Sequence, residues 1–461
     1  MKKILCILSF AFVLNASSSL DSLDLEHAIE ILEQENLEIK AAQLDVDVAK
    51  EDAKSVSGMN WGKLDFTQDV ARSNDAGNVF GFKLTSREAN FGDFGAEEFM
   101  NNFGACQNGD MGACNDMYNK PPDNLNYPDD RNFFQSKLHY EIPLFTGFAI
   151  SSYTEIMNEM TKMKKLEKAE VLNEKRYQLK KSFYDMALLE TSIQNLNHIL
   201  DNISKLEDMT QNMIEVGYAK HVDLLEVKAK KGNVERLLLQ MQANKELLYH
   251  YLSFLLNQKV TSIIPPSSEI QMVEFSDEEI LHKNLDIQKA TTGLEIRKDM
   301  ISASKAAYYP TVGAFGELAT ADNTFLGDAN DHKAYTVGAR LSWNLFNGGI
   351  DAAKLEKSRL EHLKMSSQVE LAKHGIALKL AKIRTEIKST DDEIASLEKE
   401  LALADAIYKN YEGRYKEKLA SMSDVIIKQS AQIEKILQLQ VAKNKRNEKI
   451  FALEKLANGD K

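Results

Sequence analysis

The residue types that most often carry chemistry in enzymes are scattered along this sequence. Its nine histidines form no HExxH metal-binding pattern, and the chain has neither a Gly-rich phosphate loop nor a nucleophile elbow. We interpret His139 and His221, which lie in polar surroundings, as solvent-facing side chains. The 16 methionines mostly follow helical spacing, which is typical of core packing. We therefore expect no catalytic residue, cofactor or metal site, with metal ions as cargo left as an alternative.

Two segments carry an aspartate at a place where a new helix must begin. In the first segment Ala219 precedes Asp223, and in the second Ala420, Ser421 and Ser423 precede Asp424. Side chains of Asp and Ser at a helix start accept hydrogen bonds from backbone N–H groups that have no partner within the helix. Capping is therefore one role that we assign to both aspartates.

The elements that position these residues belong to an exported chain. Residues 1–19 have the form of a signal peptide, with Lys2 and Lys3, an apolar run from Ile4 to Leu14, and small residues from Ala16 onward. Cys6 lies inside the apolar run, so we expect no lipid anchor. No later stretch approaches about 18 uninterrupted apolar residues, which predicts no transmembrane helix. The net charge of -12 argues against a nucleic-acid partner.

The rest of this 461-residue chain is organised as two repeats. Leu144-Phe145-Thr146-Gly147 matches Leu345-Phe346-Asn347-Gly348 at an offset of 201 residues, and Asp223 matches Asp424 at the same offset. An earlier match, Asn36-Leu37-Glu38-Ile39 with Asn284-Leu285-Asp286-Ile287, has an offset of 248. The first repeat therefore holds 47 extra residues between its Asn36 and Leu144 landmarks, and we place the two repeats at 20–264 and 265–461. Residues 72–130, rich in Gly, Asn, Asp and Phe, read as a long loop that contains the excess.

Each repeat predicts a very long helix, a tight turn and a second helix. Residues 148–216 contain neither Gly nor Pro and show apolar residues at three- and four-residue spacing. Such a helix would be about 100 Å long, which suits coiled coils or helical tunnels. The second repeat shows a similar span over 350–418, in which Gly375 and Gly413 interrupt the Gly-free run. Gly217 suits the positive φ of the first turn, whereas its counterpart is Lys418, so we expect the two turns to differ.

Two segments between the helices alternate apolar and polar residues with the period of a β-strand. The alternation covers residues 133–144 and 334–345, and the weaker partner strands include Leu64, Phe66 and residues 312–318. A membrane barrel and a soluble hairpin packed on a core both fit this alternation. In the barrel interpretation, the residues that face lipid are Leu138, Tyr140, Ile142, Val337, Leu341 and Trp343.

In its repeated layout the chain resembles the TolC-like outer membrane efflux protein family. The resemblance rests on the junctions at 143–147 and 343–349 and on the helix turns at 216–224 and 415–425, duplicated in one order. It implies a mainly α fold with a membrane β-barrel part, in which a homotrimer shares a twelve-stranded barrel and a periplasmic α-helical tunnel. It also implies an outer-membrane exit duct, joined by a periplasmic adaptor to a proton-driven or ATP-driven inner-membrane pump.

The resemblance adds a second role for the helix turns. In a trimer, Asp424 and Asp223 would form rings of carboxylates at the tunnel entrance that repel anions or bind cations. Tyr415 occupies a position that a charged latch uses in some family members, but Ile427 and Ala420 replace two charged residues of that latch. We therefore leave the latch open for this chain.

Cys106 and Cys114 are the cysteines that remain after removal of the signal peptide. Both lie in the 72–130 segment, which the barrel interpretation places outside the cell. An even pair in an exported protein favours a disulfide, with two free thiols as the alternative.

A second function remains open: a soluble periplasmic coiled-coil adaptor or structural protein without a membrane span. Such a protein would need one helical hairpin beside a compact β domain, whereas this chain predicts two hairpins, each with its own strand pair. Neither the cargo nor the class of pump follows from the sequence.

Overall fold

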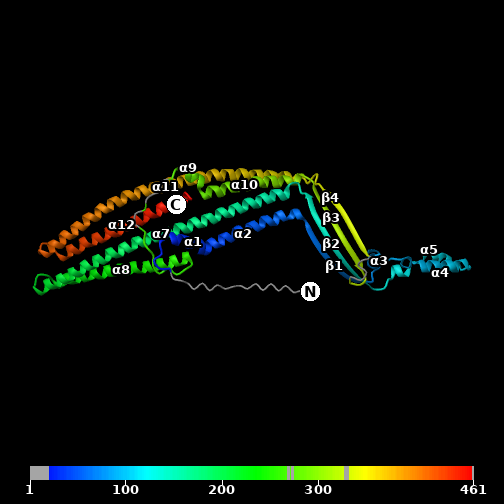
Figure 1. The fold of residues 1–461 in the computed structure, drawn as a ribbon, viewed down its shortest axis with the longest axis horizontal. Helices are drawn as coiled ribbons and strands as arrows, with labels where there is room; N and C mark the ends of the chain where they lie inside the picture. Colours follow the sequence, from blue (N-terminus) through cyan, green and yellow to red (C-terminus); the bar gives the residue numbers. More distant parts are fainter. Residues whose placement is uncertain (1–19, 267–269, 271–274, 326–331, 459–461) are drawn as a thin grey trace. The chain divides into compact units, whose positions relative to one another are not determined.

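The computed structural model describes residues 20–266, 270, 275–325 and 332–458, so the expected signal peptide lies outside the described residues. The fold is mainly α-helical with one four-stranded antiparallel sheet, as Figure 1 shows, which confirms the predicted combination of long helices with four strands per chain. Within the described part of the chain, no helix has both the length and the apolar character that a membrane crossing requires.

The chain divides into two compact units. The first comprises Met1–Lys50, Glu159–Glu295 and His362–Lys461, and the second comprises Glu51–Asn158 and Ile296–Glu361. Among the described residues, eight helices lie wholly or partly in the first unit: α1 (Leu25–Glu35), α2 (Leu37–Gly58), α7 (Ala149–Glu215), α8 (His221–Leu256), α9 (Asp277–Lys283), α10 (Leu285–Lys305), α11 (Ile350–Lys416) and α12 (Met422–Leu456).

The two repeats have matching hydrogen bonds where a short helix meets the next helix. Asn36, between α1 and α2, donates its amide N–H to the carbonyl of Leu255 over 2.8 Å, and its amide oxygen accepts from the backbone of Ile39. Asn284, between α9 and α10, donates to Leu456 over 3.1 Å and accepts from Ile287. Both asparagines are buried, and a buried amide requires such partners. The sequence repeat is therefore a structural repeat.

The hydrophobic cores of the first unit repeat in the same way. One cluster packs α1, α7 and α8 together, and a second packs α9, α11 and α12. Equivalent positions of the two clusters hold Leu32 and Ile280, Ile39 and Ile287, Leu179 and Leu380, Met186 and Ile387, and Leu252 and Leu453.

The long helices α7 and α11 each contain 67 residues. The long span expected over 350–418 is confirmed, and α11 continues through both Gly375 and Gly413. A glycine inside a helix costs only about 1 kcal/mol relative to alanine, which the surrounding helix tolerates.

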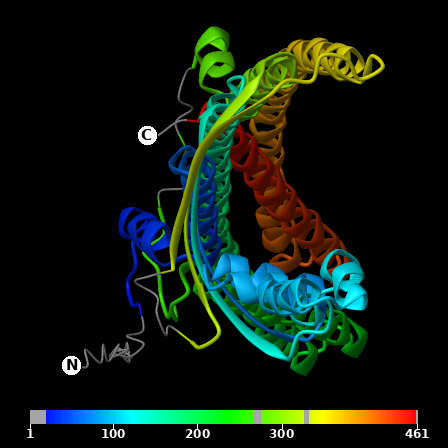
Figure 2. The same cartoon turned by 90° about the vertical axis from the view of Figure 1, so that its right-hand side faces the viewer.

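The sheet of the second unit has the strand order β1 (Lys63–Ser73), β2 (Arg131–Phe145), β3 (Thr311–Asp322) and β4 (Lys333–Ser342). Each strand is antiparallel to its neighbours, and the strands lie side by side in a curved sheet (Figure 2). Hairpins from both repeats thus join in one sheet. β4 ends at Ser342, so Trp343, which was expected within the strand, lies directly after it.

The segment 72–130 was wrongly expected to be a loop. Its first two residues extend β1, and much of the rest is helical: α3 (Ala76–Thr85), η2 (Phe91–Phe94), α4 (Ala96–Gln107), α5 (Met111–Asn119) and α6 (Asp123–Asn126). The Asp and Asn residues that suggested a loop act as helix caps: Asp75 accepts from Asn78, and Asp110 accepts from Ala113. A disulfide between Cys106 and Cys114 links α4 to α5, with the two Cα atoms 4.7 Å apart.

The strand-to-helix junctions yield a first prediction. Gly147 and Gly348 are equivalent and have φ of 63° and 68°, so alanine at either position adds about 1 to 2 kcal/mol of left-handed strain. A Cβ at Gly147 would also lie 2.7 Å from the carbonyl oxygen of Ala306, whereas Gly348 has no such neighbour within 4 Å among the described residues. We expect Gly147→Ala to lower the denaturation midpoint more than Gly348→Ala, and equal losses would contradict the close approach.

Candidate functional site

Both helix turns of the first unit have the same backbone structure. In the first turn Gly217 has φ of 77°, and Tyr218 N–H donates to Met213 over 2.7 Å. In the second turn Lys418 has φ of 63°, and Leu419 N–H donates to the carbonyl of Arg414, the residue equivalent to Met213, over 2.7 Å. The expected difference between the turns was wrong, because these hydrogen bonds hold a lysine in the left-handed conformation that glycine adopts more easily.

Asp223 and Asp424 cap the helices that follow these turns. The Asp223 carboxylate accepts from the backbone N–H of Lys220 over 2.9 Å. The Asp424 carboxylate accepts from the hydroxyl of Ser421 over 2.6 Å, and that hydroxyl accepts from Asp424 N–H over 3.1 Å. These bonds from Ser421 lower the pKa of Asp424, with Lys428 and Arg414 adding a smaller attraction. The Asp424 carboxylate is therefore held in its charged form at the helix start.

The two turns pack against one another. A cluster that includes Leu206, Val227, Tyr415 and Met422 joins α7 and α8 to α11 and α12. Burial raises the pKa of the Tyr415 phenol, with the nearby Thr210 hydroxyl opposing the shift. Tyr415 is thus a core residue of this contact rather than an exposed latch residue.

A cation–π contact crosses between the turns. The Nζ atom of Lys418 lies 3.3 Å from the centroid of the Tyr218 ring. Such contacts contribute about 0.5 to 1 kcal/mol when exposed. Tyr218 and Lys418 both lie in the turns themselves, so the contact ties the two repeats together at the extreme end of their helical pairs.

Apolar side chains remain exposed around both turns. We call this set the tip patch; its most exposed member is Leu419, at 68%. A single exposed leucine is ordinary on a protein surface, but several that gather on two adjacent turns indicate a contact surface. The members of the tip patch are Val216, Tyr218, Val222, Leu225, Leu419 and Ile427.

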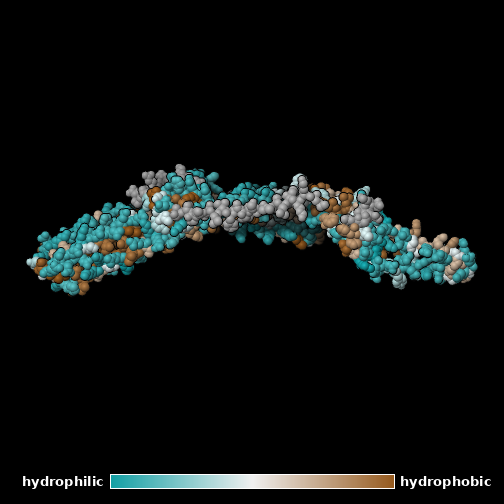
Figure 3. Space-filling view, turned by 60° about the horizontal axis from the view of Figure 1, so that its bottom comes forward, coloured by the Kyte–Doolittle hydropathy of each residue, from teal (hydrophilic) through white to brown (hydrophobic). Residues whose placement is uncertain are grey.

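The register of the sheet gathers apolar side chains on one of its faces. Phe66 is paired with Leu138, Leu138 with Leu318, and Leu318 with Tyr335, so one apolar row crosses all four strands. These side chains are exposed, and hydrophobic surface covers this part of the molecule in Figure 3. We call this surface the apolar face. It also holds Leu64, Val70, Tyr140, Ile142, Val337 and Leu341.

The opposite face of the sheet carries charges and other polar groups. Asp65 is paired with His139 and His139 with Glu317, and the His139 Nδ1 lies 3.6 Å from a Glu317 carboxylate oxygen. Lys63 is paired with Glu141. We call this surface the polar face. A sheet with one exposed apolar face and one charged face fits a boundary between lipid and water.

The predicted residues thus fall into three separate places. Gly217, Ala219, Asp223, Tyr415, Ala420, Ser421, Ser423 and Asp424 lie in or beside the two turns. Leu138, Tyr140, Ile142, Val337 and Leu341 lie on the apolar face, and Trp343 follows β4 with its indole N–H donating to the Tyr308 carbonyl over 3.2 Å. Cys106 and Cys114 lie in the helical insert between β1 and β2.

Comparisons with known proteins identify the fold. It is similar to the structure of CusC, with a TM-score of 0.76 and 14% identity over 94% of this chain and 92% of that one. It is similar to VceC of Vibrio cholerae, an outer membrane protein, with a TM-score of 0.74 and 16% identity over 94% and 96%. It is also similar to the CmeC outer membrane channel of Campylobacter jejuni, with a TM-score of 0.73 and 12% identity over 94% of this chain and 85% of that one.

At the level of sequence, no curated protein matches this chain. A family model does match: residues 278–459 fit the model described as outer membrane efflux protein. These residues form most of the second repeat, which begins near α9 and ends after α12. Residues 278–459 are therefore similar to the outer membrane efflux protein family, and the fold of the chain is similar to that of solved outer membrane channels.

Proposed function

We propose that this protein is the outer-membrane exit duct of a tripartite efflux pump or type I secretion system. Three copies would close their sheets into one twelve-stranded barrel, since four strands are too few for a membrane barrel, which needs about eight or more. The apolar face would contact outer-membrane lipid, and the polar face would line a wet lumen. The exposed apolar row that crosses all four strands carries this proposal.

The helical pairs would form the periplasmic extension of the duct. Their turns would meet a periplasmic adaptor, which in turn connects them to a proton-driven or ATP-driven inner-membrane pump. The tip patch offers this partner exposed apolar contacts. The duct itself would be a passive conduit without catalytic residues.

Cell fractionation tests this proposal directly. The protein should be recovered in outer membranes and migrate as a trimer in unheated detergent extracts, and deletion of its gene should abolish export by its pump. Recovery of a monomer in the soluble periplasmic fraction would instead support the coiled-coil adaptor. That alternative leaves the exposed apolar face without a covering surface.

The charge at Asp424 provides a second prediction. Asp424→Asn removes the charge but keeps an oxygen that can accept the Ser421 hydrogen bonds, whereas Asp424→Ala removes both. If Asp424 rings the entrance, we expect both variants to lose cation preference in planar-bilayer conductance. We expect only Asp424→Ala to lower the denaturation midpoint. Unchanged selectivity in both variants would leave capping as the role of Asp424 and contradict the ring.

A further inference from the structure

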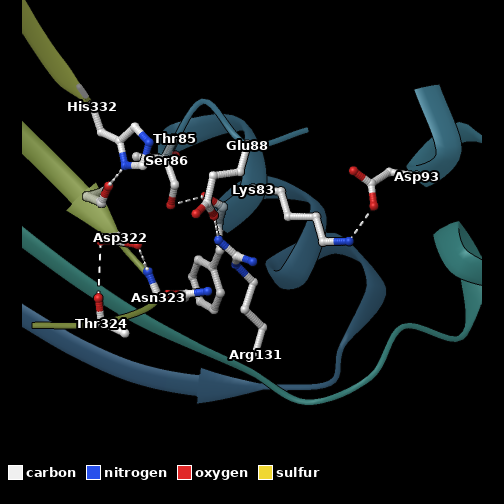
Figure 4. A network of polar contacts seen from close by, with 12 residues as sticks. Lys83, Thr85, Ser86, Glu88, Asp93, Arg131, Asp322, Asn323, Thr324 and His332 are labelled. Atoms are coloured by element: carbon white, nitrogen blue, oxygen red, sulfur yellow. Dashed lines mark hydrogen bonds and ion pairs between the residues drawn. The ribbon is translucent and has the colours of Figure 1, made fainter. Parts of the chain in front are cut away.

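Three potential metal ligands converge at one end of the sheet. Glu88 follows α3 of the insert, Asp322 ends β3, and His332 precedes β4. One ligand atom from each residue lies within 4.8 Å of the other two. Figure 4 shows Glu88 against Arg131, the first residue of β2, with Asp322 and His332 nearby at the strand ends.

The protein holds Glu88 in this position through the end of α3. Arg87 adopts φ of 58°, and Glu88 N–H donates to the Lys83 carbonyl over 2.9 Å, which turns the chain back after the helix. The Phe82 ring stacks on Phe133 of β2 with centroids 4.2 Å apart. Helix α3 is therefore packed on the sheet, and Glu88 is directed toward the strand ends.

The hydrogen bonds of His332 leave one ring nitrogen for a metal. Its Nδ1 lies 3.1 Å from the Ala321 carbonyl oxygen. A carbonyl only accepts, so Nδ1 must carry the proton and Nε2 must carry the lone pair in the neutral ring. A backbone carbonyl that orients the second ring nitrogen is the usual arrangement behind a metal-binding histidine.

Asp322 is oriented in a comparable way. Asp322 is only 6% exposed. One oxygen of its carboxylate accepts a hydrogen bond from Asn323 N–H over 2.6 Å. The other oxygen accepts from the Thr324 hydroxyl over 3.2 Å. These bonds hold the Asp322 carboxylate at the end of β3, where it lies near Glu88 and His332.

Arg131 is the cation already present in this group. Its guanidinium forms an ion pair with one oxygen of Glu88, and its side chain is 14% exposed. With His332 neutral, the two carboxylates and Arg131 carry a net charge of about −1. This net negative charge favours the binding of an added cation.

We propose that Glu88, Asp322 and His332 form a binding site for a divalent transition-metal ion, for which zinc is the natural probe. Two carboxylates and one imidazole are ligands that zinc accepts, and calcium prefers oxygen ligands alone. Tetrahedral ligands of zinc lie about 3.4 Å apart, so the side chains must close slightly around the ion. The bound ion links the insert of the first repeat to the hairpin of the second. This site is independent of the proposed export function.

Zinc titration of the full mature chain, purified in detergent and stripped with a chelator, tests the site. We expect one zinc ion per chain by calorimetry and elemental analysis, with His332→Ala and Asp322→Asn weakening binding about tenfold or more. The matched control His250→Ala removes an exposed histidine far along α8 and should bind as the wild type does. An excess of calcium should not displace the zinc. Hydrogen exchange at 76–88 should slow with zinc in the wild type but not in His332→Ala.

A further variant tests whether Arg131 and the metal ion compete for the same carboxylates. Arg131→Gln removes the competing cation and should tighten zinc binding. The proposal is overturned if the wild type binds no stoichiometric zinc, or if His332→Ala and Asp322→Asn bind as tightly as His250→Ala. Binding by Arg131→Gln alone would also overturn it, because Arg131 would then be the resident cation of this group. None of these measurements depends on export.

Discussion

Replacing Leu341 with arginine is expected to remove most of the assembled trimer from the outer membrane. Leu341 is 65% exposed on the apolar face and is paired with Val312 of β3. An arginine that faces lipid near the middle of a bilayer costs about 2 to 4 kcal/mol in each copy of a membrane barrel. Three copies would carry this cost together. Quantification of the heat-sensitive trimer band in outer-membrane extracts measures the effect.

Thr336→Arg is the matched control for this substitution. Thr336 lies on the same strand β4, is exposed and is paired with Glu317 of the polar face. This face already holds a natural arginine, Arg340, so another arginine should be accommodated there by water. We expect normal trimer from Thr336→Arg. Equal trimer from both variants would show that the apolar face does not contact lipid.

The repeated architecture was predictable because each repeat carries the same local signals. Residues such as Gly147 and Asp424 act over a few neighbours, at a strand end or a helix start, and their spacing survives in both repeats. The long α7 contains no helix breaker, so its extent was also readable from the sequence. The resemblance to the outer membrane efflux protein family followed from the order of these local signals.

Properties that depend on residues far apart in the chain were harder to predict from the sequence. The left-handed conformation of Lys418 is imposed by the hydrogen bonds of its turn and by the ring of Tyr218, about 200 residues earlier in the chain. Tyr415 occupies a position that a latch uses in some family members, and the packing of the two repeats buries it. Neither property can be predicted from the neighbouring residues in the sequence.

The insert shows how composition alone misleads. Asp and Asn are common in loops, and here they also begin helices, so the same residues support two interpretations. The sequence predicted no site at Glu88, Asp322 and His332, because no motif surrounds any of these residues in its own segment. Strand pairing and the packing of α3 bring them together, and the register was not fixed by the weak alternation of the partner strands.

Replacing Leu419 with aspartate is expected to reduce export by about tenfold or more while leaving the trimer intact. Leu419 belongs to the tip patch, and its backbone N–H, which an aspartate retains, makes the hydrogen bond that forms the turn. A charge placed in the apolar part of a protein contact must lose its hydration without gaining a partner. Measurement of cargo retention in cells, together with crosslinking of the duct to its adaptor, would report the loss.

Ser423→Asp separates the loss of apolar contact from the added charge. Ser423 is exposed in the first turn of α12, four residues after Leu419, and an aspartate there is favoured by the helix N-terminus. This control adds the same charge to the same tip without removing apolar surface, so it should export normally. If both variants lose export equally, electrostatic repulsion rather than the tip patch governs docking. If Leu419→Asp exports and crosslinks normally, the partner does not bind at this turn, and the proposed adaptor contact must lie elsewhere on the helical pairs.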